Sequence, residues 1–177
     1  MTIRVLVADD QAMIRGALAG LLDLERDIEV VAQATDGAQA LEELARLVSA
    51  DAPARASAPV DVAIIDVEMP RMDGITATQA IHSRFPGVRV LIVSTFGRPG
   101  YLQRALDAGA TGFMVKDAPV EALADGVRTV AAGGRAIDQS LALEALSAGS
   151  SPLTDREADV LREVEGGGTI ADIAHSL

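Results

Sequence analysis

Hydrophobic residues follow two alternating patterns along the first 131 positions of the chain. Short continuous apolar runs are typical of strands buried on both faces, and they alternate with segments whose apolar residues recur at helical spacing. The expected strands cover residues 3–8, 28–34, 62–66, 88–93 and 112–115. This alternation predicts an α/β fold, in which helices cover both faces of a five-stranded parallel sheet.

The order of the strands decides which of their ends become neighbours. One doubly wound arrangement has the order 2-1-3-4-5, although the sequence by itself also permits other orders. In that order, the strands at residues 3–8 and 62–66 lie side by side at the point where the winding reverses. Open α/β sheets bind their ligands at this point, beyond the carboxyl ends of the strands.

Polar residues follow four of the five expected strands, namely Asp9 and Asp10, Asp66, Ser94 and Lys116. Each has a simpler structural explanation. An aspartate can cap the next helix, a serine can belong to a turn, and a lysine can extend into solvent. Their coincidence at the ends of four strands favours a shared site over four separate explanations.

The chemistry of this set points to phosphoryl transfer. Three converging carboxylates repel one another and need a cation, and hard oxygen ligands of this kind suit Mg²⁺. Lys116 adds a positive charge and Ser94 a hydroxyl, so the set could receive a phosphoryl group on Asp66. A metal-dependent phosphohydrolase is the rival interpretation; it needs a second acid after the nucleophile, and Glu68 is the only one nearby.

Composition limits the protein class. The 177 residues suffice for one domain and a smaller remainder, and 49% of them are hydrophobic. The absence of cysteine excludes disulfides and thiolate zinc sites. No secretion signal or membrane-spanning run is evident, so we expect a cytoplasmic protein that does not contact membranes. The net charge of −11 opposes non-specific binding to nucleic acid.

The pattern changes after residue 131. Residues 132–151 are small and polar and are expected to form a linker. Thr154 and Glu157 then have the spacing of a capping box at a helix start, and a second helix is expected from Thr169. Two short helices bury little surface by themselves, so residues 152–177 are expected to be an incomplete all-α unit.

Taken together, the motifs over residues 1–131 resemble the receiver domain of two-component response regulators. The motifs that carry the resemblance are Asp9-Asp10, Asp66 with Met69-Pro70 and Asp73-Gly74, Ser94-Thr95, and residues 112–116. The resemblance implies the flavodoxin-like fold with strand order 2-1-3-4-5. It also implies a protein that is no enzyme, apart from catalysing its own phosphorylation and dephosphorylation.

Roles for individual residues follow from the same resemblance. It makes Asp66 the phosphoacceptor and places Mg²⁺ on Asp10, Asp66 and the backbone carbonyl of Glu68, with Asp9 supporting. Ser94 and Lys116 would hold the phosphoryl group. The switch residues implied by the resemblance are Ser94, Thr95, Phe113 and Lys116.

The end of the chain resembles the opening of a LuxR-type helix-turn-helix domain. Residues 152–161 and 170–174 carry this resemblance, and Lys116-Asp117 is typical of the NarL/FixJ subfamily. Residues 22–25 and 95–104 further resemble DesR-like regulators of membrane-lipid fluidity. The family pattern continues into a recognition helix, which residues 152–177 do not include, so this segment is expected to be a truncated DNA-binding domain.

The expected partners are a sensor histidine kinase and, after phosphorylation, a second copy of the chain. Residues 152–177 are acidic, so we expect no sequence-specific DNA binding by these 177 residues, and DNA contact only through the missing C-terminal part. The candidate dimer faces are Ile14, Leu18 and Leu21, or Val127 and Val130. The alternative is a stand-alone receiver that acts as an interaction or phosphate-shuttle module.

Overall fold

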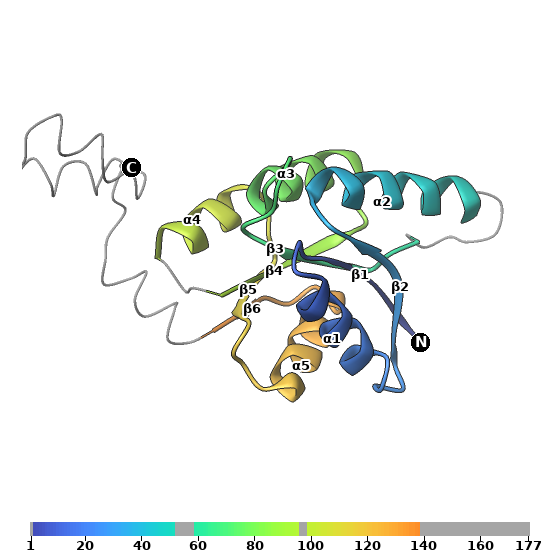
Figure 1. Cartoon of the computed structure of the whole chain (residues 1–177), viewed down its shortest axis with the longest axis vertical. Helices are drawn as coiled ribbons and strands as arrows, with labels where there is room; N and C mark the ends of the chain where they lie inside the picture. The colour runs from blue at the N-terminus through green and yellow to red at the C-terminus, as the bar shows by residue number, and fades with distance from the viewer. Residues whose placement is uncertain (1, 52–58, 96–98, 139–177) are drawn as a thin grey trace, which may run out of the picture.

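The computed structural model describes residues 2–51, 59–95 and 99–138, which form one sheet with helices on both sides (Figure 1). The strands are β1 (Ile3–Ala8), β2 (Ile28–Ala34), β3 (Val62–Asp66), β4 (Arg89–Ser94), β5 (Gly112–Val115) and β6 (Ala136–Ile137). The helices are α1 (Ala12–Leu22), α2 (Gly37–Asp51), α3 (Gly74–Arg84), α4 (Pro99–Asp107) and α5 (Val120–Ala131).

The sheet is parallel throughout and has the order β2-β1-β3-β4-β5-β6. This confirms the predicted order of the first five strands and adds a sixth at the β5 edge. Asp66 pairs with Val93, and Ser94 pairs with Val115. The carboxyl ends of β3, β4 and β5 therefore lie next to one another, as the site prediction requires.

The sixth strand comes from the stretch expected to be a linker. Ala136 pairs with Gly112 and Ile137 with Phe113, and the Asp138 N–H donates to the Phe113 carbonyl at 3.2 Å. The sheet therefore includes two residues beyond position 131. The expected helix-turn-helix segment, residues 152–177, lies outside the described residues.

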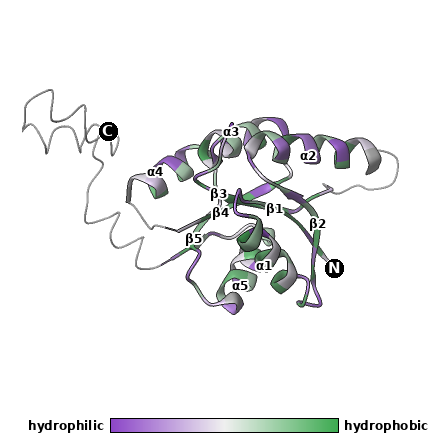
Figure 2. Cartoon of the chain, in the orientation of Figure 1, coloured by the Kyte–Doolittle hydropathy of each residue, from purple (hydrophilic) through white to green (hydrophobic). Residues whose placement is uncertain are grey.

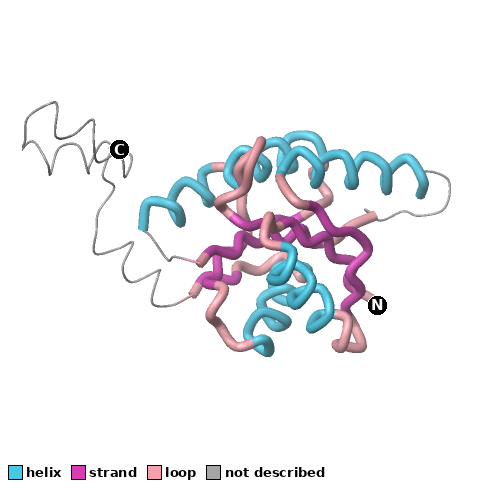
Figure 3. The backbone as a smooth tube through the Cα atoms, viewed as in Figure 1, coloured by secondary structure: helices cyan, strands magenta, loops and turns pink. Residues whose placement is uncertain are grey.

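Alternate residues of each strand face opposite layers of helices. On β1, Val5 and Val7 belong to the core beneath α1 and α5, whereas Leu6 and Ala8 belong to the core beneath α2, α3 and α4. Figure 3 shows the two helical layers, and Figure 2 shows that the strands between them are mostly hydrophobic. Burial on both faces explains why the strands have continuous apolar runs.

The structure rules out one of the two candidate dimer faces. Val127 and Val130 are both 0% exposed and belong to the core beneath α5, so that prediction was wrong. Their helical spacing marks the side of α5 that packs on the sheet. On α1, Leu18 packs against the same core, while Leu21 is 36% and Met13 is 86% exposed. Among the described residues, no helix is both long and apolar enough to span a membrane.

Candidate functional site

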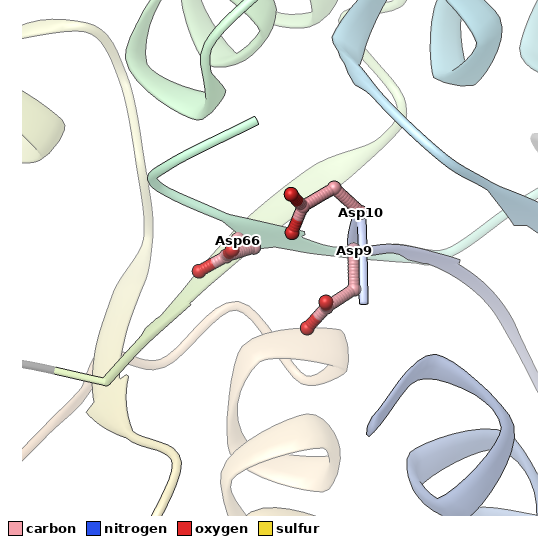
Figure 4. Close-up of side chains that lie close together, drawn as sticks. All are labelled: Asp9, Asp10 and Asp66. Carbon is pink, nitrogen blue, oxygen red and sulfur yellow. The ribbon is translucent and has the colours of Figure 1, made fainter. Parts of the chain in front are cut away.

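Three carboxylates gather where β1 and β3 end (Figure 4). Asp9 and Asp10 directly follow β1, and Asp66 is the last residue of the neighbouring strand β3. One carboxylate oxygen from each residue lies within 4.8 Å of the other two. Asp9 and Asp66 are 1% and 4% exposed, whereas Asp10 is open to solvent. The cluster is therefore buried on one side and accessible on the other.

Lys116 completes the cluster from the end of β5. Its Nζ lies 2.7 Å from Asp9 Oδ2 and 3.1 Å from Asp66 Oδ1, and its side chain is only 8% exposed. Lys116 Nζ and Asp9 Oδ2 are both buried. Among the described residues, they have no hydrogen-bond partner beyond these ion pairs. Three carboxylates against one ammonium leave an excess of negative charge, so the site can accept a further cation.

Burial has opposite consequences for the two central groups. It raises the pKa of Asp66 to about 6; Lys116 opposes this increase, and the negative charge of Asp9 adds to it. Burial lowers the pKa of Lys116, but its contacts with Asp9 and Asp66 outweigh that effect and raise the pKa overall. At neutral pH the lysine is therefore protonated, and Asp66 is largely ionised.

The chain after Asp66 folds back closely on the strand. The Gly74 N–H donates to the Val67 carbonyl at 2.9 Å, and a Cβ on Gly74 would overlap the carbonyl oxygen of Asp66. Asp73 caps α3 by accepting the Thr76 N–H at 2.8 Å. The Asp73-Gly74 pair thus serves two needs, a helix cap and a close approach that only glycine permits.

The Asp66 carboxylate uses one oxygen for its contacts within the chain. Oδ1 accepts the Val67 N–H at 2.9 Å and pairs with Lys116. The described residues show no corresponding contact on Oδ2. One oxygen is therefore held by the protein, and the other is available to a ligand.

The remaining predicted residues lie near this cluster. Ser94 is buried at the end of β4, and its carbonyl accepts the Lys116 N–H at 2.8 Å, while Thr95 is exposed. Phe113 is fully buried in the core beneath α2, α3 and α4. Glu68 is exposed, and its side chain accepts a hydrogen bond from the Tyr101 hydroxyl at 3.2 Å. The switch roles of these residues and the metal contact of Glu68 stay predictions.

Two sets of contacts around the site were not predicted. The Gln11 N–H and the Arg15 guanidinium donate to Asp9, at 2.8 Å on Oδ1 and 2.6 Å on the backbone carbonyl. Arg71, in the loop after β3, pairs with the buried Asp36. Asp36 is followed by a glycine, a pair that is typical of turns, but its partner is 35 residues away and the sequence offers no signal for the pair.

The donor set fits Mg²⁺. All three side chains offer carboxylate oxygens, which are the ligands that this ion prefers, and the exposed side of Asp10 leaves space for water or a phosphate oxygen. The charge excess described above also favours a cation. The carboxylate cluster of Asp9, Asp10 and Asp66 is thus compatible with a bound Mg²⁺ ion.

Comparison with known proteins agrees with this geometry. A family model described as the response regulator receiver domain matches residues 5–128. The transcriptional regulatory protein DesR of Bacillus subtilis is 40% identical over 175 residues, which cover 99% of this chain and 81% of DesR. The transcriptional regulatory protein UhpA of Escherichia coli is 34% identical over 176 residues, which cover 99% of this chain and 82% of UhpA.

Solved structures show the same fold. The receiver domain of NarL from Mycobacterium tuberculosis is 36% identical with a TM-score of 0.64, covering 75% of this chain and 98% of that domain. The response regulator ChrA, from a haem-sensing two-component system, is 32% identical with a TM-score of 0.63, covering 99% of this chain and 81% of ChrA. These matches confirm the family predicted from the motifs: the chain belongs to the response regulators of two-component systems, and residues 5–128 are its receiver domain.

Proposed function

We propose that Asp66 accepts a phosphoryl group from a partner sensor histidine kinase, with Mg²⁺ as cofactor. The observation that supports this most is the contact of the buried Asp66 carboxylate with Lys116 and its proximity to Asp9 and Asp10. Asp66 ends β3, which lies between β1, the strand before Asp9 and Asp10, and β5, the strand before Lys116. Membership of the response regulator family provides the same expectation independently.

The reaction transfers one phosphoryl group between two side chains. The P–N bond to the kinase histidine breaks, a P–O bond to Asp66 forms, and the imidazole leaves. Asp66 needs to be ionised for this attack, and its pKa of about 6 leaves it largely ionised at neutral pH. Asp10, Asp66 and the Glu68 carbonyl would hold Mg²⁺, with Asp9 supporting, and the bound ion would supply positive charge to neutralise the transferred oxygens.

Lys116 and Ser94 would bind the phosphoryl group once it is attached. Lys116 already lies against Asp66, and the backbone hydrogen bond from Lys116 to Ser94 links the ends of β5 and β4. A new charge of about −1.5 to −2 on Asp66 is a strong local bias on both strand ends. Thr95, which directly follows Ser94, and Phe113, which lies on β5 three residues before Lys116, would change position in response.

The consequence of this switch would be dimerisation and control of DNA binding and transcription. DesR and UhpA, two similar proteins, are named transcriptional regulatory proteins, which supports a role in transcription here. Exposed apolar residues of α1, such as Met13 and Leu21, offer a surface for a second copy. We further propose that the part of residues 132–151 that follows β6 links the receiver to the start of a helix-turn-helix domain at 152–177.

A phosphorylation assay tests this proposal. The protein would be incubated with acetyl phosphate, with and without Mg²⁺, and analysed by intact mass and size-exclusion chromatography. We expect a Mg²⁺-dependent gain of one phosphoryl group together with a larger apparent size, and neither change in Asp66→Asn. No mass gain under any condition would contradict the proposed acceptor role.

A further inference from the structure

The loop between β3 and α3 contains an unusual turn at Arg71. Its φ angle is +62°, and it is the only residue other than glycine with positive φ among the described residues. The Met72 N–H donates to the Pro70 carbonyl at 2.6 Å, so the turn is a γ-turn with a left-handed central residue. Such turns are rare and strained for a residue that carries a Cβ. Other contacts must therefore hold Arg71 in place.

The strongest of these contacts is an ion pair with Asp36, at the corner between β2 and α2. Asp36 is 1% exposed, and its Oδ2 accepts hydrogen bonds from both Nε and Nη2 of Arg71, the former at 2.9 Å. Burial alone would raise the pKa of Asp36, but the Arg71 contact and backbone N–H donors lower it overall. The carboxylate is therefore ionised at neutral pH, as a charge-assisted hydrogen bond requires.

The two oxygens of Asp36 have separate roles. Oδ1 caps α2 by accepting the N–H groups of Ala38 at 2.9 Å and Gln39 at 3.1 Å. Oδ2 holds Arg71. The loop thus attaches to the rigid end of a helix through the same side chain that caps this helix.

A backbone contact joins the same two segments. The Gly37 N–H donates to the Met72 carbonyl at 3.1 Å, and a Cβ on Gly37 would lie only 2.9 Å from that oxygen. Glycine at this position therefore lets the loop approach the start of α2 closely. The loop is consequently held at the centre of its γ-turn by the Arg71 side chain and at the following residue by the Met72 backbone.

A fixed Arg71 also restricts the part of the loop nearest the phosphoacceptor. Only Met69 and Pro70 separate Glu68 from Arg71. Met69 is anchored by burial, at 9% exposed, and proline has a fixed φ angle. The backbone between Glu68 and Arg71 therefore has little conformational freedom, so a displacement of Arg71 would also displace the backbone of Glu68.

We infer that Arg71 is a positioning residue, whose ion pair with Asp36 fixes the β3–α3 loop and keeps the Glu68 backbone carbonyl beside the metal-binding carboxylates. The inference rests on the proposed function, in which this carbonyl contributes to the Mg²⁺ site. A ligand carried by a loop binds more tightly when the loop is ordered beforehand, because binding then loses less conformational entropy. Removing groups that orient metal ligands typically weakens metal binding by about 10- to 100-fold.

The test separates the ion pair from the helix cap and from general stability. Asp36→Asn retains an oxygen that can cap α2 but places an amide N–H₂ toward Arg71, and Arg71→Ala removes the other partner. Arg46→Ala is the matched control, because Arg46 is 61% exposed, similar to the 64% of Arg71, and also pairs with an acid, Glu43. Mg²⁺ affinity would be measured by calorimetry on the 177-residue chain.

We expect Asp36→Asn and Arg71→Ala each to raise the Mg²⁺ dissociation constant about tenfold, and the double variant to be no worse than either. Arg71→Lys should recover part of the loss, and Arg46→Ala should bind like the wild type. Hydrogen exchange without Mg²⁺ should accelerate at the amides of residues 67–74 in both single variants.

Two outcomes would overturn the inference. Wild-type Mg²⁺ affinity in both single variants would show that the pair contributes only stability. Unchanged hydrogen exchange in residues 67–74 would show that the pair does not hold the loop. Wild-type protein that binds no Mg²⁺ would instead contradict the proposed metal site, and hydrogen exchange alone would then decide whether Arg71 positions the loop.

Discussion

Replacing Asp66 by asparagine removes a buried charge, and we expect this change to stabilise the metal-free protein. The carboxylate is 4% exposed and shares its site with the negatively charged Asp9. Asparagine has nearly the same shape and carries no charge. The variant loses the attraction to Lys116, but the repulsion and the burial penalty that it also loses are together larger, because the pKa of Asp66 is raised overall.

The magnitude follows from the pKa. The pKa of Asp66 rises from 3.8 to about 6 on folding. One pKa unit corresponds to about 1.4 kcal/mol, so ionised Asp66 lowers the free energy of unfolding by about 3 kcal/mol at neutral pH. The folded state binds the extra proton between these two pKa values, so wild-type stability falls as pH rises through this window. Below about pH 4 the carboxyl is protonated in both states, and the difference from asparagine disappears.

Urea unfolding followed by circular dichroism, with EDTA present, measures this difference. We expect Asp66→Asn to be more stable than the wild type by about 3 kcal/mol near pH 7.5 and by less than about 1 kcal/mol near pH 4. Asp10→Asn is the control; because Asp10 is exposed, its effect should stay below about 1 kcal/mol at both pH values. An Asp66→Asn protein that is no more stable than the wild type near pH 7.5 would refute the argument.

Mg²⁺ provides a second arm of the same experiment. An ion that binds only the folded wild type stabilises it by about 2.7 kcal/mol at a concentration 100 times the dissociation constant. Since Asp66→Asn lacks one of the proposed ligands, Mg²⁺ should narrow the gap between the two proteins. A gap that is insensitive to Mg²⁺ would show that Asp66 does not contribute to the metal site.

Three further substitutions have defined outcomes. Gly74→Ala places a Cβ against the Asp66 carbonyl and should lower the free energy of unfolding in urea by at least about 2 kcal/mol. The control Gly16→Ala in α1 has open space around the new Cβ and should raise the free energy of unfolding by about 0.5–1 kcal/mol. Equal effects of the two substitutions would contradict this account of the Gly74 position. Lys116→Met leaves the buried Asp9 and Asp66 without their cation. It should lower the free energy of unfolding by about 3 kcal/mol near pH 7.5 and by less near pH 4. An equal loss of stability at both pH values would contradict the electrostatic role of Lys116.

Residues at the strand ends were the most predictable part of the site. Asp9, Asp10, Asp66 and Lys116 all follow continuous apolar runs, and a parallel sheet brings the carboxyl ends of its strands to one edge. Only the strand order remained open, and the family resemblance supplied it. The contacts of Lys116 with Asp9 and Asp66 then follow from the positions of β1, β3 and β5.

Features that depend on distant partners could not be predicted. Ala136 and Ile137 form β6 because Gly112 lacks a Cβ, which would otherwise lie 2.8 Å from the Ala136 carbonyl oxygen. A two-residue strand is too short to show a hydrophobic period. Similarly, arginine gives no local signal for positive φ, and the side-chain partner of Arg71, Asp36, is remote in sequence.

Helical spacing on α5 shows a different limit. The pattern of Val127 and Val130 correctly indicated an apolar face, but periodicity does not state whether that face meets the sheet or a second molecule. In the structure the face packs on the sheet, in the same hydrophobic cluster as Val93 and Met114. Identifying an interface therefore required knowledge of which residues stay exposed, such as Met13 on α1.

The most direct test of the central claim is to locate the phosphoryl group. After incubation with acetyl phosphate and Mg²⁺, reduction with borohydride converts a phosphoaspartate into a stable homoserine, and peptide mass spectrometry then identifies its position. We predict that the modification lies on Asp66, that it is absent from Asp9, Asp10 and Asp61, and that Asp66→Asn shows none. A modification at another aspartate, or one that persists in Asp66→Asn, would contradict the assignment of Asp66 as the phosphoacceptor.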